Sequence, residues 1–163
     1  MPDDQHGPAS GGSPDAQRAR TPTIWDPEVE QVEEAECLRL IAGGRIGRLA
    51  YSSPSGVAII PVGYELQDGH IMFPTPLGSP TDQDLRTGIA DAAYHVAFEV
   101  DEFDIDAQEG WTVYIQGAAS HVGVRQDGTI DWSPDADASA DSQFEHFLCI
   151  SPTRMAGRRL SRH

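Results

Sequence analysis

Apolar and polar residues alternate along the second half of the chain with a period of two, which is the pattern of half-buried β-strands. Tyr94, Val96, Phe98 and Val100 alternate with polar neighbours, and a similar alternation occupies residues 111–124. Each of these two segments therefore predicts a strand with one face on a core.

Shorter apolar runs predict the remaining strands. The run at 57–66 is largely apolar, which predicts a strand that is covered on both faces. Asp68-Gly69 is a strong hairpin signal and joins this run to a returning strand. The further strands are expected at 45–52, 70–75 and 144–150.

Two helices are expected among these strands. Asp26 suits the N-cap, Pro27 suits the first helical position, and the acidic residues up to Glu36 complement the positive end of the helix dipole. Gly43-Gly44 ends this helix, and residues 81–87 predict one or two further helical turns. One helix followed by five or six strands with hairpin connections indicates a mainly β fold, a small closed or nearly closed barrel.

We predict a disordered tail followed by one domain. Residues 1–25 are rich in Pro, Gly, Ser and acidic residues, and cannot bury enough apolar surface to offset the entropy of ordering. The domain is expected at 26–163. Within it, 101–109 is expected as an acidic loop and 154–162 as a basic tail.

The charge of the chain excludes several classes of function. It has 26 acidic and 11 basic residues, a net charge of -15 at pH 7, and every basic residue is an arginine. Without lysine there is no Schiff-base lysine and no P-loop lysine. The negative charge repels phosphates, so neither nucleic acid nor an anionic membrane is expected as a partner. No apolar run is long enough to span a bilayer and the first residues do not resemble a signal peptide, so we expect a cytoplasmic location.

Side chains that bind metals or act as nucleophiles form no known motif. Cys37 and Cys149 are far apart in the sequence and are expected to be small buried hydrophobic residues. The six histidines show no HExxH spacing and no pairing with cysteine, so no metal site is predicted. No GxSxG motif or nucleophile–base pair is present, so no catalytic side chain is predicted.

Six segments, in the right order along the chain, resemble the pyridoxamine 5'-phosphate oxidase-like family of the actinobacterial type. Each segment alone is weak, but together they cover most of residues 28–160. The segments are ECLRLIAGGRIGRLA (36–50), IPVGY (60–64), FPTPLGS (73–79), VAFEVD (96–101), GWTV (110–113) and SPTRMAGRRL (151–160).

This resemblance implies a six-stranded split β-barrel with an N-terminal helix and one short helix, which forms a homodimer and holds FMN at the subunit interface. In the assignment that it implies, Pro61 and Val62 line the flavin ring, and Thr75 and Ser79 lie at the phosphate. Trp111 and Arg158 face the flavin from the partner's side. The residues assigned to the cofactor are Pro61, Val62, Phe73, Thr75, Ser79, Trp111 and Arg158.

Two prolines depart from the family pattern at the phosphate. The family commonly has an arginine and a lysine at the positions of Pro74 and Pro80, and these cations hold the FMN phosphate. Proline has neither a charge nor a backbone N–H, and each lost charged hydrogen bond costs about 1.5–3 kcal/mol. A weakened phosphate anchor is therefore expected, with Arg86 or the arginines at 154–159 as candidates to replace it.

Two functions stay open. The first is an FMN-dependent oxidoreductase that acts on an unknown small molecule, in which the flavin itself carries the reaction and no side-chain nucleophile is needed. The deazaflavin F420 is a variant of this hypothesis. The alternative is a non-enzymatic split-barrel protein that binds another small ligand, such as haem, or no cofactor. Pro74 and Pro80 are the residues that separate the two hypotheses.

Overall fold

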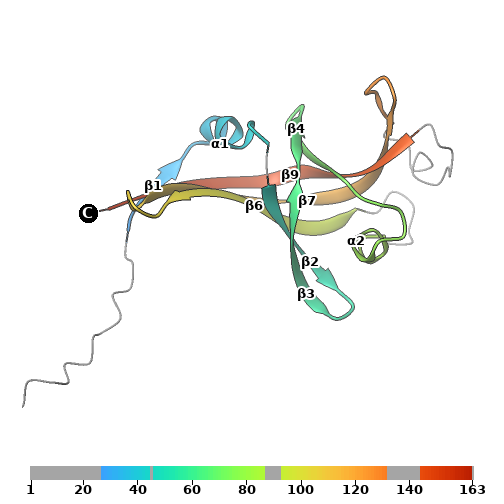
Figure 1. Ribbon diagram of the computed structural model, residues 1–163, viewed down its shortest axis with the longest axis horizontal. Helices are drawn as coiled ribbons and strands as arrows, with labels where there is room; N and C mark the ends of the chain where they lie inside the picture. The colour runs from blue at the N-terminus through green and yellow to red at the C-terminus, as the bar shows by residue number, and fades with distance from the viewer. Residues whose placement is uncertain (1–26, 45, 87–92, 132–143, 163) are drawn as a thin grey trace, which may run out of the picture.

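The structure, a computed structural model, describes residues 27–44, 46–86, 93–131 and 144–162 and is mainly β (Figure 1). The prediction of a mainly β, split-barrel-like fold with two helices is confirmed. The helices are α1 (Glu34–Ile41) and α2 (Pro80–Asp84). The strands are β1 (Glu28–Val32), β2 (Ile46–Ser53), β3 (Gly56–Gly63), β4 (Glu65–Gln67), β5 (His70–Pro74), β6 (Tyr94–Asp104), β7 (Glu109–Arg125), β8 (Ile130–Asp131) and β9 (Phe144–Ser161).

The strands form one antiparallel sheet that curls without closing. Its order is β3-β2-β6-β7-β9-β5-β4, and β1 and β8 pair with β9 and β7 outside this path. Both β3 and β4 are edges in the described part of the chain, so the barrel is open between them. The long strands β7 and β9 run side by side along the molecule and connect the barrel to the part that carries β1 and α1 (Figure 1).

The core fills the inner side of the curled sheet. Phe98 of β6 is fully buried, lies edge-on to Tyr64 with ring centroids 5.3 Å apart, and stacks on Phe73 at 6.5 Å. Gly47 on β2 makes room for this ring, because a Cβ at that position would meet the Phe98 ring at 2.2 Å. Phe98 can therefore pack on β2 because residue 47 has no side chain.

The helix predicted from Asp26 begins later than expected. Residues 28–32 form strand β1, which pairs with the last part of β9, from Glu28 opposite Ser161 to Val32 opposite Gly157. Helix α1 starts only at Glu34, with acidic residues in its first turn as predicted. The predicted helix start at Asp26 was wrong because Asp26 and Pro27 are local signals. They carry no information about the edge of β9, with which residues 28–32 pair.

Three other segments differ from the sequence prediction. The predicted basic tail is the continuation of strand β9, and the predicted acidic loop at 101–109 shrinks to residues 105–108 because β6 and β7 extend into it. The run expected as one strand at 57–66 is divided between β3 and β4, which lie at opposite ends of the sheet. Strand β3 has one open face, where Val57 is 80% exposed and Ile59 is 66% exposed. An apolar run shows that a strand has apolar residues on both faces, but not that the same chain covers both.

The Asp68-Gly69 hairpin is confirmed. It joins β4 to β5, and both residues have positive φ angles, 51° and 80°, as the tight hairpin turn requires. The predicted disordered tail at 1–25 lies outside the described residues. Within the described ranges, no helix has both the length and the apolar character that crossing a membrane requires.

Gly157 is expected to be essential for packing α1 on the sheet. A Cβ at residue 157 would lie 2.5 Å from Cys37 Sγ and 3.0 Å from Val32 Cβ. Overpacking of this kind costs about 1–3 kcal/mol, so Gly157→Ala should lower the free energy of unfolding in urea by that amount. Gly43→Ala is the matched control: its Cβ would meet no atom within 4 Å, and it should change the stability by less than about 0.5 kcal/mol. Equal stabilities for the two variants would contradict the close approach of α1 to β9.

Candidate functional site

The loop between β5 and α2 is held at both ends by hydrogen bonds. At its start, the Thr75 N–H donates to the carbonyl of His146 on β9 at 2.9 Å. At its end, Ser79 caps α2, because its Oγ accepts the Asp82 N–H at 3.2 Å. Pro80 follows in the first turn, where a missing N–H is tolerated. We call residues 75–79 the α2 loop.

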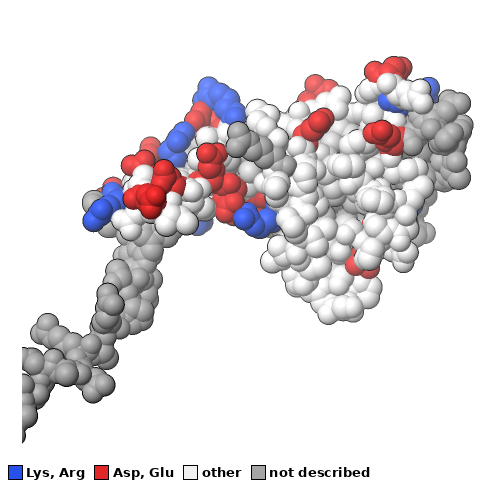
Figure 2. Space-filling view, in the orientation of Figure 1, with Lys and Arg blue, Asp and Glu red and all other residues white. Residues whose placement is uncertain are grey.

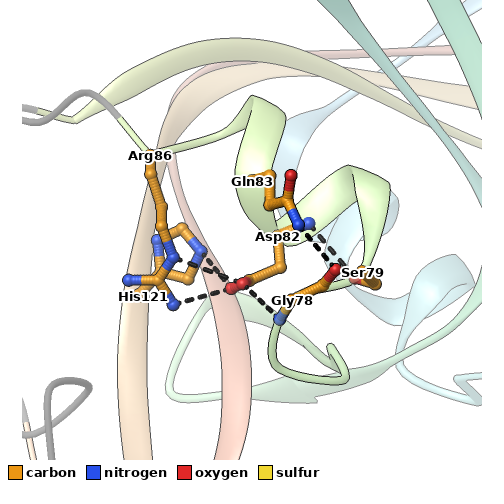
Figure 3. Close-up of polar contacts among 6 residues, drawn as sticks. All are labelled: Gly78, Ser79, Asp82, Gln83, Arg86 and His121. Carbon is orange, nitrogen blue, oxygen red and sulfur yellow. Dashed lines mark hydrogen bonds and ion pairs between the residues drawn. The ribbon is translucent and has the colours of Figure 1, made fainter.

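Asp82 is the centre of a buried polar cluster beside the α2 loop (Figure 3). The residue is only 2% exposed. Its Oδ2 accepts the Gly78 N–H at 2.8 Å and Arg86 Nε at 3.3 Å, and its Oδ1 accepts Arg86 Nη2 at 2.7 Å. His121 Nε2, from strand β7, lies 3.1 Å from Oδ1. The carboxylate is therefore surrounded by nitrogen atoms from the loop, from the end of α2 and from the sheet.

The pKa of Asp82 is lowered by this surrounding. Burial on its own would raise the pKa, because it penalises the charged form, but several favourable contacts outweigh it. They are the hydrogen bonds from Arg86 and from the Gly78 N–H, together with the charges of Arg86 and His121. Asp82 is therefore an anion at neutral pH.

The α2 loop satisfies most of its polar groups within the protein. The Gly78 carbonyl accepts the Gln83 side-chain amide at 2.8 Å, and the Ser79 N–H donates to the Pro76 carbonyl at 3.1 Å. Among the side chains of this loop, the Thr75 hydroxyl is buried and has no hydrogen-bond partner. An unpartnered buried hydroxyl is unfavourable, so Thr75 is the position in this loop where a polar ligand atom fits.

A second candidate region lies on the outward side of the sheet. Residues paired across neighbouring strands share a face, and the register places five residues in one row across β3, β2, β6, β7 and β9. We call the surface along this row the outer face. The row consists of Pro61, Arg48, Glu99, Tyr114 and Ala156.

The outer face is hollowed near β7 and β9, where two arginines have no carboxylate partner. The groove there has a volume of about 440 Å³ and is lined by Glu99, Thr112, Tyr114, Gln116, Arg154, Ala156 and Arg158. Its carboxylate is engaged, because Glu99 accepts Thr112 Oγ1 at 3.1 Å and Arg48 Nη1 at 3.3 Å. Among the described residues, none forms an ion pair with Arg154 or Arg158. These two cations are therefore open to a ligand's acceptor atoms.

The seven residues assigned to the cofactor by resemblance fall into four places. Pro61 and Val62 lie on β3, and Pro61 faces outward. Thr75 and Ser79 lie in the α2 loop, whereas Phe73 is fully buried in the core. Trp111 and Arg158 lie on adjacent strands but point to opposite faces of the sheet, because Trp111 pairs with Arg159 and Thr112 pairs with Arg158. One chain therefore cannot offer Trp111 and Arg158 to the same side of a ligand.

The reasoning from sequence missed Asp82 and His121. A signal for Asp82 was present, because Ser79-Pro80-Thr81-Asp82 has the spacing of a helix capping box. No local signal marks His121, which reaches Asp82 from a strand that comes much later in the chain. In the described ranges, no group of three or more His, Cys, Asp or Glu residues is placed to hold a metal ion.

Asp82 is expected to stabilise the fold in a pH-dependent way. Its folded pKa is lowered, so its contribution is fully present above the unfolded pKa, about 3.9, and is lost as the pH falls through the folded value. Asp82→Asn should lower the free energy of unfolding at pH 7 by about 1–3 kcal/mol, and should flatten its fall between about pH 5 and pH 2. Urea unfolding across this range tests both effects.

The matched control for this test is Asp84→Asn. Asp84 lies on the same helix but accepts a hydrogen bond from Tyr51, at 3.3 Å, and not from the α2 loop. This variant should retain the wild-type slope against pH in the acid range. A slope that is the same in Asp82→Asn as in the wild type would show that Asp82 does not have the lowered pKa.

Comparison with known proteins identifies relatives of this fold. The family described as pyridoxamine 5'-phosphate oxidase matches residues 33–159. The uncharacterized protein Rv0080 of Mycobacterium tuberculosis is 33% identical over 95 residues, which is 58% of this chain and 62% of that relative. The match thus spans less than two thirds of the relative's length.

Two solved structures share the fold. The FAD binding protein from Mycobacterium smegmatis is 23% identical, with a TM-score of 0.58 over 81% of this chain and 98% of its own. A FAD-binding protein from Mesorhizobium loti is 20% identical, with a TM-score of 0.62 over 84% of this chain and 100% of its own. At identities below 25%, these two structures show only that the fold is shared. The family match over residues 33–159 shows which family the chain comes from. On that match, the chain belongs to the pyridoxamine 5'-phosphate oxidase-like family.

Proposed function

We propose that the protein is a flavin-dependent oxidoreductase that works as a homodimer on a small-molecule substrate, with FMN as the first candidate cofactor. The observation that carries this proposal is the family match over 33–159, which includes all seven residues assigned to the flavin. Two of the similar structures are FAD-binding proteins, which supports a flavin as the ligand. The deazaflavin F420 is the variant of the same proposal.

The proposed site is shared between two copies of the chain. Pro61 and Arg158 both face outward, but they lie on β3 and β9, which are four strand steps apart in the sheet. At about 4.8 Å a step, this is about 19 Å, which is too far for one planar ring to contact both residues of one chain. In the proposal, Pro61 therefore lines the ring in one copy and Arg158 approaches it from the other, whereas Val62 and Trp111 lie on the opposite face of the sheet from these two residues.

The open face of β2 and β3 supports the dimer. Ile46 is 64% exposed and lies on the same side as Val57 and Ile59. Charged side chains gather around β1, α1 and the adjoining strand ends, whereas the region of β2 and β3 carries few on the face shown (Figure 2). A large apolar surface on an edge strand is usually covered by a partner, and a second copy forms a closed, two-fold contact.

A cytoplasmic location, without nucleic-acid or membrane partners, belongs to the same proposal. It is supported by the net charge of -15 and by Cys37 and Cys149, which are both free thiols buried in the structure.

A second candidate function is a non-enzymatic split-barrel protein that binds haem or no cofactor. It is favoured by the residues that flank the α2 loop: Pro74 and Pro80 stand where the resemblance places the family's cations, and Asp82 pairs with Arg86. The visible absorption spectrum separates the candidates, because a flavin, a deazaflavin and a haem absorb differently.

We expect added flavin to bind to the purified protein and to lose its fluorescence on titration. Binding should require the dimer, since each ring contacts two copies. A Soret band in the purified protein, or unquenched flavin fluorescence with both FMN and F420, would favour the non-enzymatic candidate and overturn the proposal.

Ile59→Asp is expected to dissociate the homodimer. A carboxylate at this exposed apolar position would be buried without a partner at the interface, so the dissociation constant should rise about tenfold or more. Sedimentation equilibrium measures this directly. Ile105→Asp is the matched control, because Ile105 is 86% exposed but lies in the turn between β6 and β7; this variant should remain dimeric. A wild-type protein that is monomeric at micromolar concentration would exclude the shared site.

A further inference from the structure

The groove on the outer face has Arg154 at one end and Arg158 at the other. Both arginines lie on β9 with Ala156 between them. Residues that are two apart in a strand share a face, and four residues of strand span about 13 Å. The groove, of about 440 Å³, therefore lies over the small side chain of Ala156 and has a cation at each end.

Tyr114 supplies an aromatic surface between the two arginines. It lies on β7 directly opposite Ala156, it lines the groove, and it is 39% exposed. Aromatic rings pack favourably on one another, offset or edge to face. A flat, conjugated ring system therefore fits in the groove against Tyr114.

The Arg154 end of the groove offers two side chains with unused hydrogen-bond donors. Arg154 pairs across the strands with Gln116, and within the described ranges neither side chain has a hydrogen-bond or ion-pair partner. The register shift of the β7–β9 ladder lies beside them, where the Thr153 hydroxyl donates to the Gln116 carbonyl at 3.2 Å and ties the strands together. A guanidinium binds a planar carboxylate through two parallel N–H bonds, and the amide adds a third donor.

The Arg158 end of the groove is less suited to an anion. Thr112, the residue opposite Arg158, donates its hydroxyl to Glu99 Oε1 at 3.1 Å. A ligand carboxylate at this end would lie near the Glu99 carboxylate and be repelled by it. At the Arg154 end, the residue in the same row on β6 is Ala97, which has no charge. The anionic part of a ligand therefore belongs at Arg154.

The number of cations at this end limits the charge of the ligand. One guanidinium balances one negative charge, which is the charge of a carboxylate at pH 7. A phosphate monoester carries about -1.5 to -2, so it would bring an unbalanced charge to a chain whose net charge is -15. A carboxylate is therefore the better match.

We propose that the groove binds a flat, conjugated molecule with one carboxylate, which Arg154 and Gln116 hold while the ring system packs against Tyr114. This inference rests on the proposed function, in which Arg158 at the other end approaches the flavin ring, and it identifies the ligand as the substrate of that enzyme. Arg154 fixes the orientation of the substrate, so that the end away from the carboxylate points towards the flavin. The binding itself is tested below without flavin.

The first test measures the binding of 2-naphthoate to the whole chain by isothermal titration calorimetry, with no flavin added. Wild-type protein should bind 2-naphthoate about tenfold or more tightly than 2-naphthamide, which has a similar shape but no charge. It should also bind acetate, which lacks the ring system, about tenfold or more weakly than 2-naphthoate. Equal affinities for 2-naphthoate and either of the other two compounds, or no binding of 2-naphthoate, would overturn the inference.

The second test removes the cation at the anion end. Arg154→Gln should lower the affinity for 2-naphthoate about tenfold or more and leave that for 2-naphthamide unchanged. Arg39→Gln is the matched control, because it removes the same charge from an exposed arginine on α1 that pairs with Glu36; this variant should bind as the wild type does. An equal loss of affinity in the two variants would show that the net charge of the protein, and not the groove, determines binding.

The third test places a carboxylate of the protein in the position proposed for that of the ligand. Gln116→Glu puts an acidic side chain opposite Arg154, with which it can form an ion pair, so the affinity for 2-naphthoate should fall about tenfold or more. Gln116→Met, of similar size but uncharged, should lose less than Gln116→Glu. Equal affinities in the wild type and Gln116→Glu would overturn the inference.

The outcomes separate this inference from the proposed function. If 2-naphthoate binds with the expected dependence on Arg154 but neither FMN nor F420 binds, the proposed function fails and the groove remains a carboxylate site. If a flavin binds but 2-naphthoate does not, the inference fails and the proposed function stands.

Discussion

The antiparallel ladder between β7 and β9 is the constraint on which the rest of the structure depends. It runs from Gly110 to Arg125 with one register shift at Gln116/Gly117. Gly117 permits this shift, because a Cβ there would lie 2.5 Å from the Ser151 carbonyl oxygen. One side of the ladder contributes Val113 and Ile115 to the core, and the other side forms the groove on the outer face. Further along, β7 brings His121 to Asp82 and β9 brings the His146 carbonyl to Thr75. Both candidate regions are therefore positioned by the same two strands.

The parts of the fold that could be predicted from the sequence are those with a local cause. The period-two alternation predicted β6 and β7, and Asp68-Gly69 predicted the β4–β5 turn, because both signals act between near neighbours in the chain. The start of the first helix was wrong because β1 pairs with β9, at the other end of the sequence. The exposure of β3 was missed for a related reason: hydrophobicity shows what a strand can bury, whereas the cover depends on the topology of the whole sheet.

The candidate site divides in the same way. The resemblance to a family supplied positions such as Pro61, Thr75 and Arg158, and the capping spacing of Ser79 and Asp82 was readable in the sequence. What no local pattern could supply is the contact of Asp82 with His121, or the absence, in the described part of the chain, of an ion pair to Arg154 or Arg158. In a chain with 26 acidic and 11 basic residues, an arginine would be expected to find an acidic partner. Only the register of β7 and β9 shows that these two do not.

The two prolines and Asp82 together determine the charge of the α2 loop. Pro74 and Pro80, at the two ends of the loop, supply neither a charge nor an N–H donor. Arg86 beside the loop pairs with the buried carboxylate of Asp82, and His121 lies against the same carboxylate. Cations that can contact an anionic or electron-rich group are also present elsewhere in the molecule. The outer face supplies them, since Arg154 and Arg158 border a groove with Tyr114 between them. The outer face is therefore a second region, besides the α2 loop, that can contact a ligand.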